Sequence, residues 1–280
     1  MDIQLLKTFL EVKATRHFGR AAENLYLTQA AVSARIKQLE TVLGTPLFTR
    51  YRNNLQLTSA GERLVEHAQT ILLSWDRARA DISLKKNQAH VLSLGATSGL
   101  WDLTLQKSLN LLHAELPQVA LRAESHGQDV VIRRLMERTL DIGLVYEPAK
   151  LSELHSQEIT QAQLVLVSSI QGDTVSNALN RNYVSVDWGT AFDINFGQTF
   201  HEVLPAVLYT THARIALDFI HYHGGSAYLP LALVKSTLGK SLFLVENAAT
   251  FNRPIFACQH VENRNTSLIE KAIAIIKDLE

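Results

Sequence analysis

The chain has 280 residues, of which 46% are apolar and 19% charged, so it can form two or three packed units and is neither disordered nor fibrous. The net charge of zero hides an asymmetry, because residues 1–88 hold 13 Lys or Arg against 8 Asp or Glu, whereas residues 89–280 hold 14 against 19. A basic amino-terminal part beside an acidic remainder is typical of a part that binds phosphate groups.

Cysteine content and hydropathy indicate the cellular compartment of the protein. The single cysteine, Cys258, excludes an internal disulfide, and we interpret it as a buried thiol in a reducing compartment rather than a redox switch. No run approaches the ~18 apolar residues of a membrane span, and the chain starts without the basic and apolar segments of an export signal. We therefore expect a cytoplasmic protein without membrane contact.

The first residues predict two short helices and a tight turn. Apolar residues recur at helical spacing at Leu6, Phe9, Leu10, Ala21, Ala22 and Leu25. Tyr26 and Leu27 then break the pattern. Small alanines in the second stripe let another helix approach closely, which predicts a compact helical core.

A third helix is expected between an N-cap at Thr28 and a stop at Gly44. Its buried side should carry Val32, Ile36, Leu39 and Leu43. The opposite side is small or polar, with Gln29, Ala30, Ser33, Ala34 and Lys37. An apolar back and a small front after a tight turn favour a helix-turn-helix that enters the DNA major groove, with a plain helical hairpin as the alternative.

Residues 45–57 predict a short hairpin, because Asn53-Asn54 is turn-prone and the following residues alternate. Arg50 and Arg52 flank its tip. A solvated surface turn would have the same pattern. Beside a helix-turn-helix, we interpret the hairpin as a basic wing whose arginines reach the minor groove.

A long helix is expected from Ser59 to about Lys85, capped by the Ser59–Glu62 box or by Thr58 instead. Its apolar residues are spaced by four and three, at Leu64, Ala68, Ile71, Trp75, Ala78 and Ile82. This narrow stripe is typical of a two-chain seam and predicts a dimerisation helix, with packing on its own domain as the alternative. Residues 85–88 should form a polar hinge.

From Val91 the pattern changes to alternating strands and helices. The first round comprises strands at 91–95, 119–124 and 141–146 and helices at about 99–116 and 130–138. The second comprises strands at 163–168, 183–186, 206–209 and 226–230 and a helix at 212–223, followed by a last helix at 266–279. Such alternation predicts parallel α/β units.

A series of motifs runs through the amino-terminal region: Leu6 to Phe9, Phe18 to Leu25, Thr28 to Ser33, Ile36 to Glu40, Leu43 to Arg50 and Leu57 to Gly61. In their order and spacing, these motifs resemble the LysR-type transcriptional regulators. Weaker matches follow at Ser93 to Gly95, Leu116 to Val119, Leu140 to Gly143 and His223 to Pro230. Within the family, the HdfR group is resembled at Arg16 to Arg20, Arg52 to Asn54, Leu100-Trp101 and Asp187 to Gly189.

The resemblance implies an α/β multidomain architecture. A winged helix-turn-helix would occupy residues 1–58, a linker helix that pairs antiparallel with its partner 59–88, and a periplasmic-binding-protein-like effector domain 89–280. Two α/β subdomains, about 91–162 with 260–280 and about 163–259, would enclose a cleft. The implied partners are double-stranded promoter DNA with an imperfect inverted repeat, a second copy of the chain in a dimer or tetramer, and a small-molecule effector. RNA polymerase is a further candidate partner, and no cofactor is implied.

The front of the third helix and the wing supply the candidate DNA contacts. Gln29 can pair with adenine, Ser33 can bond to a base edge or a phosphate, and Lys37 can reach a phosphate. Thr28 can contact phosphate while capping, and Ala30 and Ala34 can meet thymine methyl groups. Further candidates are Arg50, Arg52 and Asn53 on the wing and Arg16 and Arg20 near the second helix.

The candidate effector contacts follow predicted strand ends, where open α/β sheets bind ligands. Thr97 and Ser98 lie in the turn after the first strand, with helix capping as their alternative role. His126, Tyr146 and Thr211 follow other strands. We expect a carboxylate-bearing ligand, although no Lys or Arg stands in the 95–99 turn to fix its charge.

An enzyme or a free small-molecule-binding protein is the rival class. The chain has no GxxxxGK, GxSxG or HExxH motif. His221 and His223 are two residues apart, which places them on different sides of a helix. We therefore predict no metal site, and we predict no catalytic residues. A gel shift with duplex DNA separates a regulator from this alternative.

Overall fold

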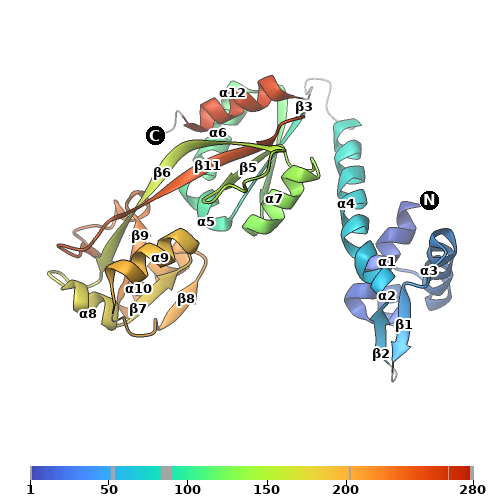
Figure 1. Cartoon of the computed structure of the whole chain (residues 1–280), viewed down its shortest axis with the longest axis horizontal. Helices are drawn as coiled ribbons and strands as arrows, with labels where there is room; N and C mark the ends of the chain where they lie inside the picture. The colour runs from blue at the N-terminus through green and yellow to red at the C-terminus, as the bar shows by residue number, and fades with distance from the viewer. Residues whose placement is uncertain (1, 52–53, 83–89, 202, 264, 278–280) are drawn as a thin grey trace. The chain divides into compact units, whose positions relative to one another are not determined.

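The computed structural model describes residues 2–51, 54–82, 90–201, 203–263 and 265–277. They form two compact units, Met1–Ser83 and Leu84–Glu280, which Figure 1 shows in blue to cyan and in green to red. No helix in these ranges combines the length and the apolar character that crossing a bilayer requires.

The first unit begins with the predicted helix pair and third helix, α1 (Ile3–Thr15), α2 (Phe18–Asn24) and α3 (Gln29–Leu43). Each starts at a side-chain cap, because Asp2 and His17 accept from backbone N–H groups of α1 and α2, and Thr28 accepts from the N–H of Ala31 at 3.2 Å. Gly44 ends α3 with a φ of 69°, as predicted.

The core of this unit is formed by the helix faces expected from the sequence. Its fully buried side chains include Leu6, Phe9, Ala21, Val32 and Leu39. Leu43 departs from the expected buried face, since 41% of it is exposed. Leu43 is the last residue of the helix, and the chain turns away from it at Gly44.

A hairpin and a long helix complete the unit. β1 (Phe48–Tyr51) and β2 (Asn54–Leu57) pair antiparallel, as the wing prediction required. The helix α4 (Ser59–Ile82) follows, and Thr58 caps it by accepting from the N–H of Gly61 at 3.0 Å. Thr58, rather than the Ser59 box, is therefore the cap.

The two interpretations of the α4 stripe apply to different parts of the helix. Leu64 and Ala68 pack on the core of the first unit. Ile71, Trp75 and Ile82, further along, are exposed by 39%, 46% and 88%. The first turns of α4 thus belong to their own unit, and the later apolar residues lack a cover within the described chain.

The second unit is built on one mixed sheet of nine strands, in the order β4-β3-β5-β11-β6-β9-β7-β8 with β10 beside β6. The parallel strands at one end are β3 (His90–Ala96), β4 (Val119–Ser125) and β5 (Ile142–Val145). Those at the other end are β7 (Tyr183–Val186), β8 (Leu208–Thr210) and β9 (Ser226–Pro230). These two groups with their helices are called the first lobe and the second lobe below, and they correspond to the two predicted α/β rounds.

Two long antiparallel strands connect the lobes, β6 (Leu154–Ser168) and β11 (Phe251–His260) (Figure 1). The far end of β6 pairs with β9, and Phe256 to Cys258 of β11 pair with β5. The sequence pattern gave only 163–168 of β6 and none of β11. Pro254 lies within β11, and proline argues against a central strand when the pattern is read alone.

Helices cover both faces of the first lobe. α6 (Gln106–Glu115) and α12 (Thr266–Lys277) pack together on one face, and α7 (Gln128–Met136) packs on the other (Figure 1). The predicted helix at 99–116 is broken into α5 (Ser98–Leu100), a π-helical turn (Trp101–Leu105) and α6.

The second lobe carries the remaining helices, α8 (Val175–Asn180), α9 (Thr190–Thr199), α10 (Ala213–His223) and α11 (Leu231–Val234). Of these, the sequence pattern predicted only α10. The short β10 (Phe243–Leu244) lies beside the end of β6. Phe192 and Phe196 of α9 contribute to an aromatic cluster with Tyr228 and Phe251.

Candidate nucleic-acid interface and ligand cleft

The recognition-helix candidate α3 has two sharply different sides. Val32, Ile36 and Leu39 are at most 3% exposed. The front residues expected to meet DNA are all exposed, namely Thr28, Gln29, Ala30, Ser33, Ala34 and Lys37. The helix therefore presents a surface of short side chains, with one amide, one hydroxyl and one ammonium group that can reach base edges or phosphates.

Polar contacts fix α3 to its neighbours. Glu40 accepts from the N–H of Leu47 at 2.7 Å, which ties the helix to the start of the hairpin. A Cβ on Gly61 would collide with the Leu47 carbonyl, so glycine lets α4 pack closely there. Arg35 is half-buried and donates to Thr8 at 3.4 Å, which turns this cation toward α1.

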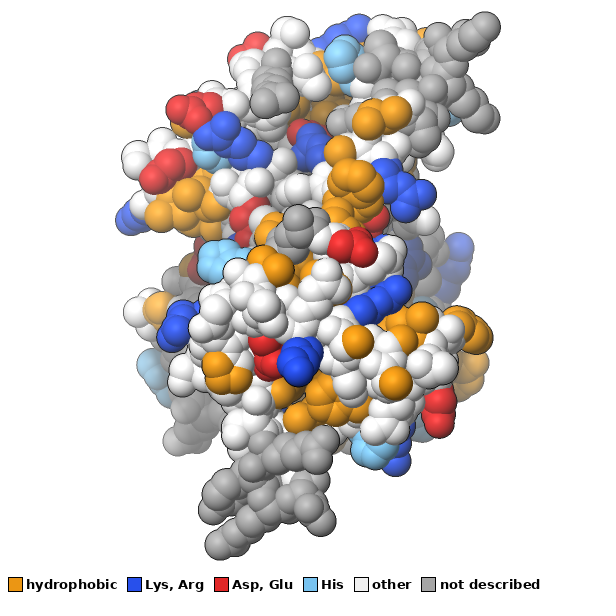
Figure 2. All heavy atoms as spheres, turned by 90° about the vertical axis from the view of Figure 1, so that its right-hand side faces the viewer, with side chains coloured by type: hydrophobic (Ala, Val, Ile, Leu, Met, Phe, Trp, Pro, Cys, Tyr) orange, Lys and Arg blue, Asp and Glu red, His pale blue; other side chains and the backbone are white. Residues whose placement is uncertain are grey.

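The remaining DNA candidates are partly described. Arg16 and Arg20 are exposed at the junction of α1 and α2. Arg50 lies in β1 opposite Leu55, and its side chain lies outside the described part, as do Arg52 and Asn53 altogether. On the face drawn in Figure 2, Lys and Arg side chains are scattered among uncharged ones. On this face, the basic side chains do not form one continuous patch.

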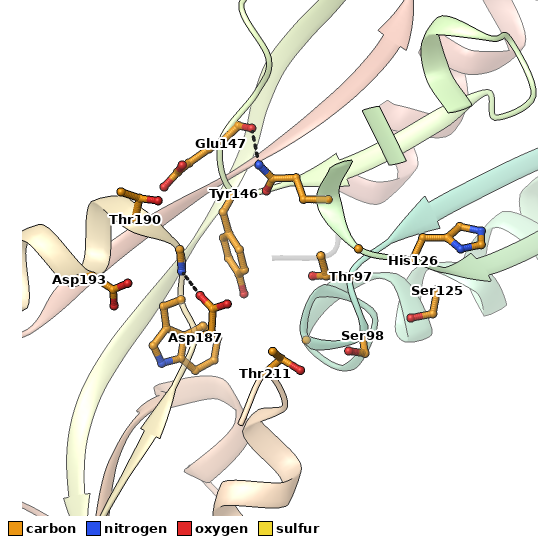
Figure 3. Close-up of a pocket in the computed structure, with 15 residues that line it drawn as sticks. Thr97, Ser98, Ser125, His126, Tyr146, Glu147, Asp187, Thr190, Asp193 and Thr211 are labelled. Atoms are coloured by element: carbon orange, nitrogen blue, oxygen red, sulfur yellow. Dashed lines mark hydrogen bonds between the residues drawn. The ribbon is translucent and has the colours of Figure 1, made fainter. Parts of the chain in front are cut away.

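A cleft of about 730 Å³ lies between the two lobes of the second unit. All five residues predicted from strand ends line it, namely Thr97, Ser98, His126, Tyr146 and Thr211 (Figure 3). Each directly follows its strand or stands one residue further on, so the carboxyl-end rule brought together residues from four strands.

Carboxylates that sequence reasoning missed also line the cleft: Glu147, Asp187 and Asp193. Glu147 and Asp187 follow β5 and β7, so the strand-end rule that selected Tyr146 could have found them. Asp193 lies on α9, which the sequence pattern did not predict. The lining contains no Lys or Arg among the described residues, which disagrees with the expected carboxylate-bearing ligand.

One of these carboxylates is neutralised within the protein. The buried guanidinium of Arg253 donates to Glu147 at 3.0 Å, and Glu147 also accepts from the N–H of Ala191 at 3.1 Å. Asp187 accepts from the N–H of Gly189 at 2.9 Å. No ion pair with Asp187 or Asp193 exists in the described part of the chain. Burial, and then the charge of Asp187, raise the pKa of Asp193, while the charge of Arg253 acts in the opposite direction.

Tyr146 stands between the lobes. Its ring meets Trp188 edge to face at 6.2 Å, and the Arg253 guanidinium lies 5.4 Å from its centre. The side chain is 7% exposed, and its hydroxyl is buried without a hydrogen-bond partner among the described atoms. Burial raises the pKa of this phenol, so the hydroxyl stays neutral.

Apart from the paired Glu147, the first-lobe wall of the cleft is rich in hydroxyl groups. Ser98 is 3.0 Å from Nε2 of His212, which brings a first-lobe residue against the start of α10. His126 lies 2.8 Å from Glu124, which also pairs with the buried Arg134. Burial lowers the pKa of His126, so the ring is uncharged at pH 7. The described residues contain no group of three or more side chains that could hold a metal ion.

Comparisons with known proteins match both units. Residues 3–62 match the family model described as "Bacterial regulatory helix-turn-helix protein, lysR family", and residues 85–279 match "LysR substrate binding domain". The regulator HdfR of Yersinia enterocolitica is 41% identical over 239 residues, covering 82% of this chain and 81% of that protein. HdfR of Yersinia pestis strain Pestoides F has the same identity and coverage.

Solved structures share the fold. The LysR family regulator CbnR matches with a TM-score of 0.76 and 18% identity over 99% of both chains. Full-length CbnR complexed with its target DNA matches with a TM-score of 0.74 and 20% identity, over 99% of this chain and 100% of that chain. The two family models cover both units in the order expected of a DNA-binding regulator rather than an enzyme. The chain belongs to the LysR family of transcriptional regulators.

Proposed function

We propose that the protein recognises an imperfect inverted repeat in promoter DNA by placing the front of α3 in the major groove. The observation that carries this proposal is the exposed row of small and polar side chains opposite a fully buried aliphatic side. Gln29 and Ser33 lie one turn apart and would contact base edges, while Lys37, one turn further, would contact phosphate. Arg16, Arg20 and the wing residues 50, 52 and 53 would hold the flanking backbone.

Two copies of α3 would read the two halves of the repeat. The exposed Ile71, Trp75 and Ile82 of α4 support self-association, since large apolar side chains on one helix stripe lose solvent contact when a second helix covers them. A dimer would place its recognition helices in successive major grooves, about one helical turn apart or a multiple of it. Residues 1–58 would bind DNA, residues 59–88 would form the dimerisation helix, and residues 89–280 would bind the effector.

A small molecule in the cleft would control DNA binding. It would contact Thr97, Ser98, His126, Tyr146 and Thr211, and it would act by binding one arrangement of the lobes better than another. Contact with RNA polymerase and a cytoplasmic location remain predictions from the family.

Fluorescence anisotropy with the full chain tests the DNA proposal. Sites mapped genome-wide would supply a specific duplex, and a scrambled duplex of equal length would be the control. We expect the specific site to bind about 1,000-fold more tightly or better at physiological salt. Equal affinity for both duplexes, or no binding even at low salt, would overturn the proposal.

The self-association proposal has its own test. Trp75→Lys places a charge on the exposed apolar stripe of α4, whereas Ser74→Lys places the same charge on the neighbouring exposed residue. Analytical ultracentrifugation should show a weaker dimer for Trp75→Lys only. Equal dissociation constants for the two variants would remove α4 from the interface.

A further inference from the structure

We propose that the ligand of the cleft carries a protonated amine, which is bound by the carboxylates of Asp187 and Asp193 together with the hydroxyl of Tyr146. This inference rests on the proposed effector function and names the chemical class of the effector. It replaces the carboxylate-bearing ligand expected from the sequence.

The charges of the lining favour a cation. Three carboxylates line the cleft, and in the described chain Arg253 forms an ion pair with Glu147. The charge of Arg253 also acts on Asp193, but burial and the charges of Asp187 and Glu147 oppose it. The lining itself includes no described Lys or Arg and only the uncharged ring of His126. A carboxylate entering this cleft would add to the repulsion, whereas an ammonium group would relieve it.

An independent observation comes from Tyr146. Its hydroxyl is buried and has no hydrogen-bond partner in the described chain, although buried polar groups are nearly always paired. Figure 3 shows this hydroxyl and the Asp187 carboxylate pointing into the same space, which both residues line. An ammonium group has three N–H donors and can satisfy the phenolic oxygen and a carboxylate at once.

The rest of the cleft suits the remainder of such a ligand. The wall of the first lobe offers the hydroxyl groups of Thr97, Ser98 and Ser125, which both donate and accept hydrogen bonds. Thr190 and Thr211 add hydroxyl groups on the side of the second lobe. A small polar amine would therefore be held at its charged end by carboxylates and elsewhere by neutral groups.

The experiment uses the full-length protein and charge-matched small molecules. L-Lysine and 1,4-diaminobutane are the amine probes, and succinate and glutarate are anions of similar length. Thermal shift and calorimetry should show binding of at least one amine and of neither dicarboxylate. Binding of a dicarboxylate, or no binding of either amine at millimolar concentration, would overturn the inference.

Variants locate the binding. Asp187→Asn keeps an oxygen for the N–H of Gly189 but removes the charge, and Asp193→Asn is its counterpart on α9. Each should weaken amine binding about tenfold or more, because the ammonium group loses a charge-assisted hydrogen bond, which is stronger than a neutral one. Asp218→Asn removes an exposed carboxylate of α10 that does not line the cleft, and it should leave the affinity unchanged.

Tyr146→Phe separates a ligand contact from a structural role. The change deletes only the unpartnered hydroxyl, so the melting temperature without ligand should not fall, while amine affinity should fall several-fold. A lower melting temperature with unchanged affinity would assign the hydroxyl to stability and overturn its role in binding.

The DNA anisotropy assay on the same samples distinguishes the two levels of failure. If specific DNA binding persists and no amine binds, only this inference fails. If specific DNA binding itself is absent, the proposed function fails with it.

Discussion

The recognition helix and the cleft are two opposite kinds of site. On α3, one uninterrupted run of residues presents the front, so neighbours in sequence are neighbours in space. In the cleft, the lining residues come from the ends of several strands and from α9, and residues as far apart in sequence as Thr97 and Thr211 line the same space (Figure 3). The first site depends on local helical periodicity, and the second depends on how the whole sheet is ordered.

The largest effect is expected from a substitution on the buried side of α3, which tests whether local helical periodicity fixes this site. Leu39→Ala removes a fully buried side chain from the core of the first unit and should cost about 3 kcal/mol of unfolding free energy. Chemical denaturation of the full chain measures this loss, and DNA binding should weaken while ligand binding in the second unit persists. As a control, Val42→Ala changes a residue of the same helix that is 58% exposed and should have a small effect. Equal costs for the two variants would contradict the orientation of α3.

The cleft has a corresponding weak point at Gly189. Its φ is +86°, and an added Cβ would lie 3.0 Å from Nη2 of Arg253 and 3.2 Å from Oε1 of Glu147. Gly189→Ala should therefore cost about 2 kcal/mol and disturb that ion pair. Gly197 lies inside α9, the helix that Gly189 precedes as N-cap, and it has open space around it, so Gly197→Ala should be neutral or stabilising by up to about 1 kcal/mol. Similar melting temperatures for both variants would contradict the geometry at Gly189.

A change of sequence preference tests the front of α3 more finely. Ser33→Arg introduces a bidentate donor at an exposed front position and should shift base preference by about 1–3 kcal/mol at one step of the site. Titration of duplexes that differ at single base pairs, at fixed salt, measures the shift. Ser74→Arg adds the same charge on α4 and should strengthen binding to all duplexes equally or leave it unchanged. If Ser33→Arg behaved in the same sequence-blind way, Ser33 would not face the bases.

The smallest expected effect concerns the wing. Arg52 was predicted from the sequence to contact DNA and lies outside the described residues. Arg52→Ala should weaken binding to all sequences alike and lower the slope of log affinity against log salt by about 1. Measurements at several salt concentrations would show this. A loss confined to one sequence would instead make Arg52 a base-reading residue.

Local pattern predicted much of this fold. The caps at Thr28 and Gly44 and the buried positions Val32, Ile36 and Leu39 follow from spacing alone, because a helix repeats every 3.6 residues and depends on near neighbours. The α/β alternation likewise placed β3, β4, β5 and β7 almost to the residue. Leu43 was predicted wrongly, since whether the last turn of a helix is covered depends on a distant element.

The pairing of distant strands was not predicted from the sequence. β11 was missed because Pro254 and an irregular pattern hide a strand that gains its hydrogen bonds from β5 and β6, about a hundred residues earlier. The strand-end rule found Tyr146 and Thr211, but nothing local indicated that Asp193 would join them, because α9 carries no clear amphipathic stripe.

The sequence by itself determined that the protein is a helix-turn-helix regulator. This motif consists of contiguous residues, and helical spacing decides which of them are buried and which are exposed. Only the tertiary structure decided the charge of the cleft. Glu147 forms an ion pair with Arg253, a residue more than a hundred positions away, whereas no Lys or Arg of the described chain forms an ion pair with Asp187 or Asp193. Electrostatic balance depends on distances in space, and those are fixed by the ordering of the strands rather than by neighbours along the chain.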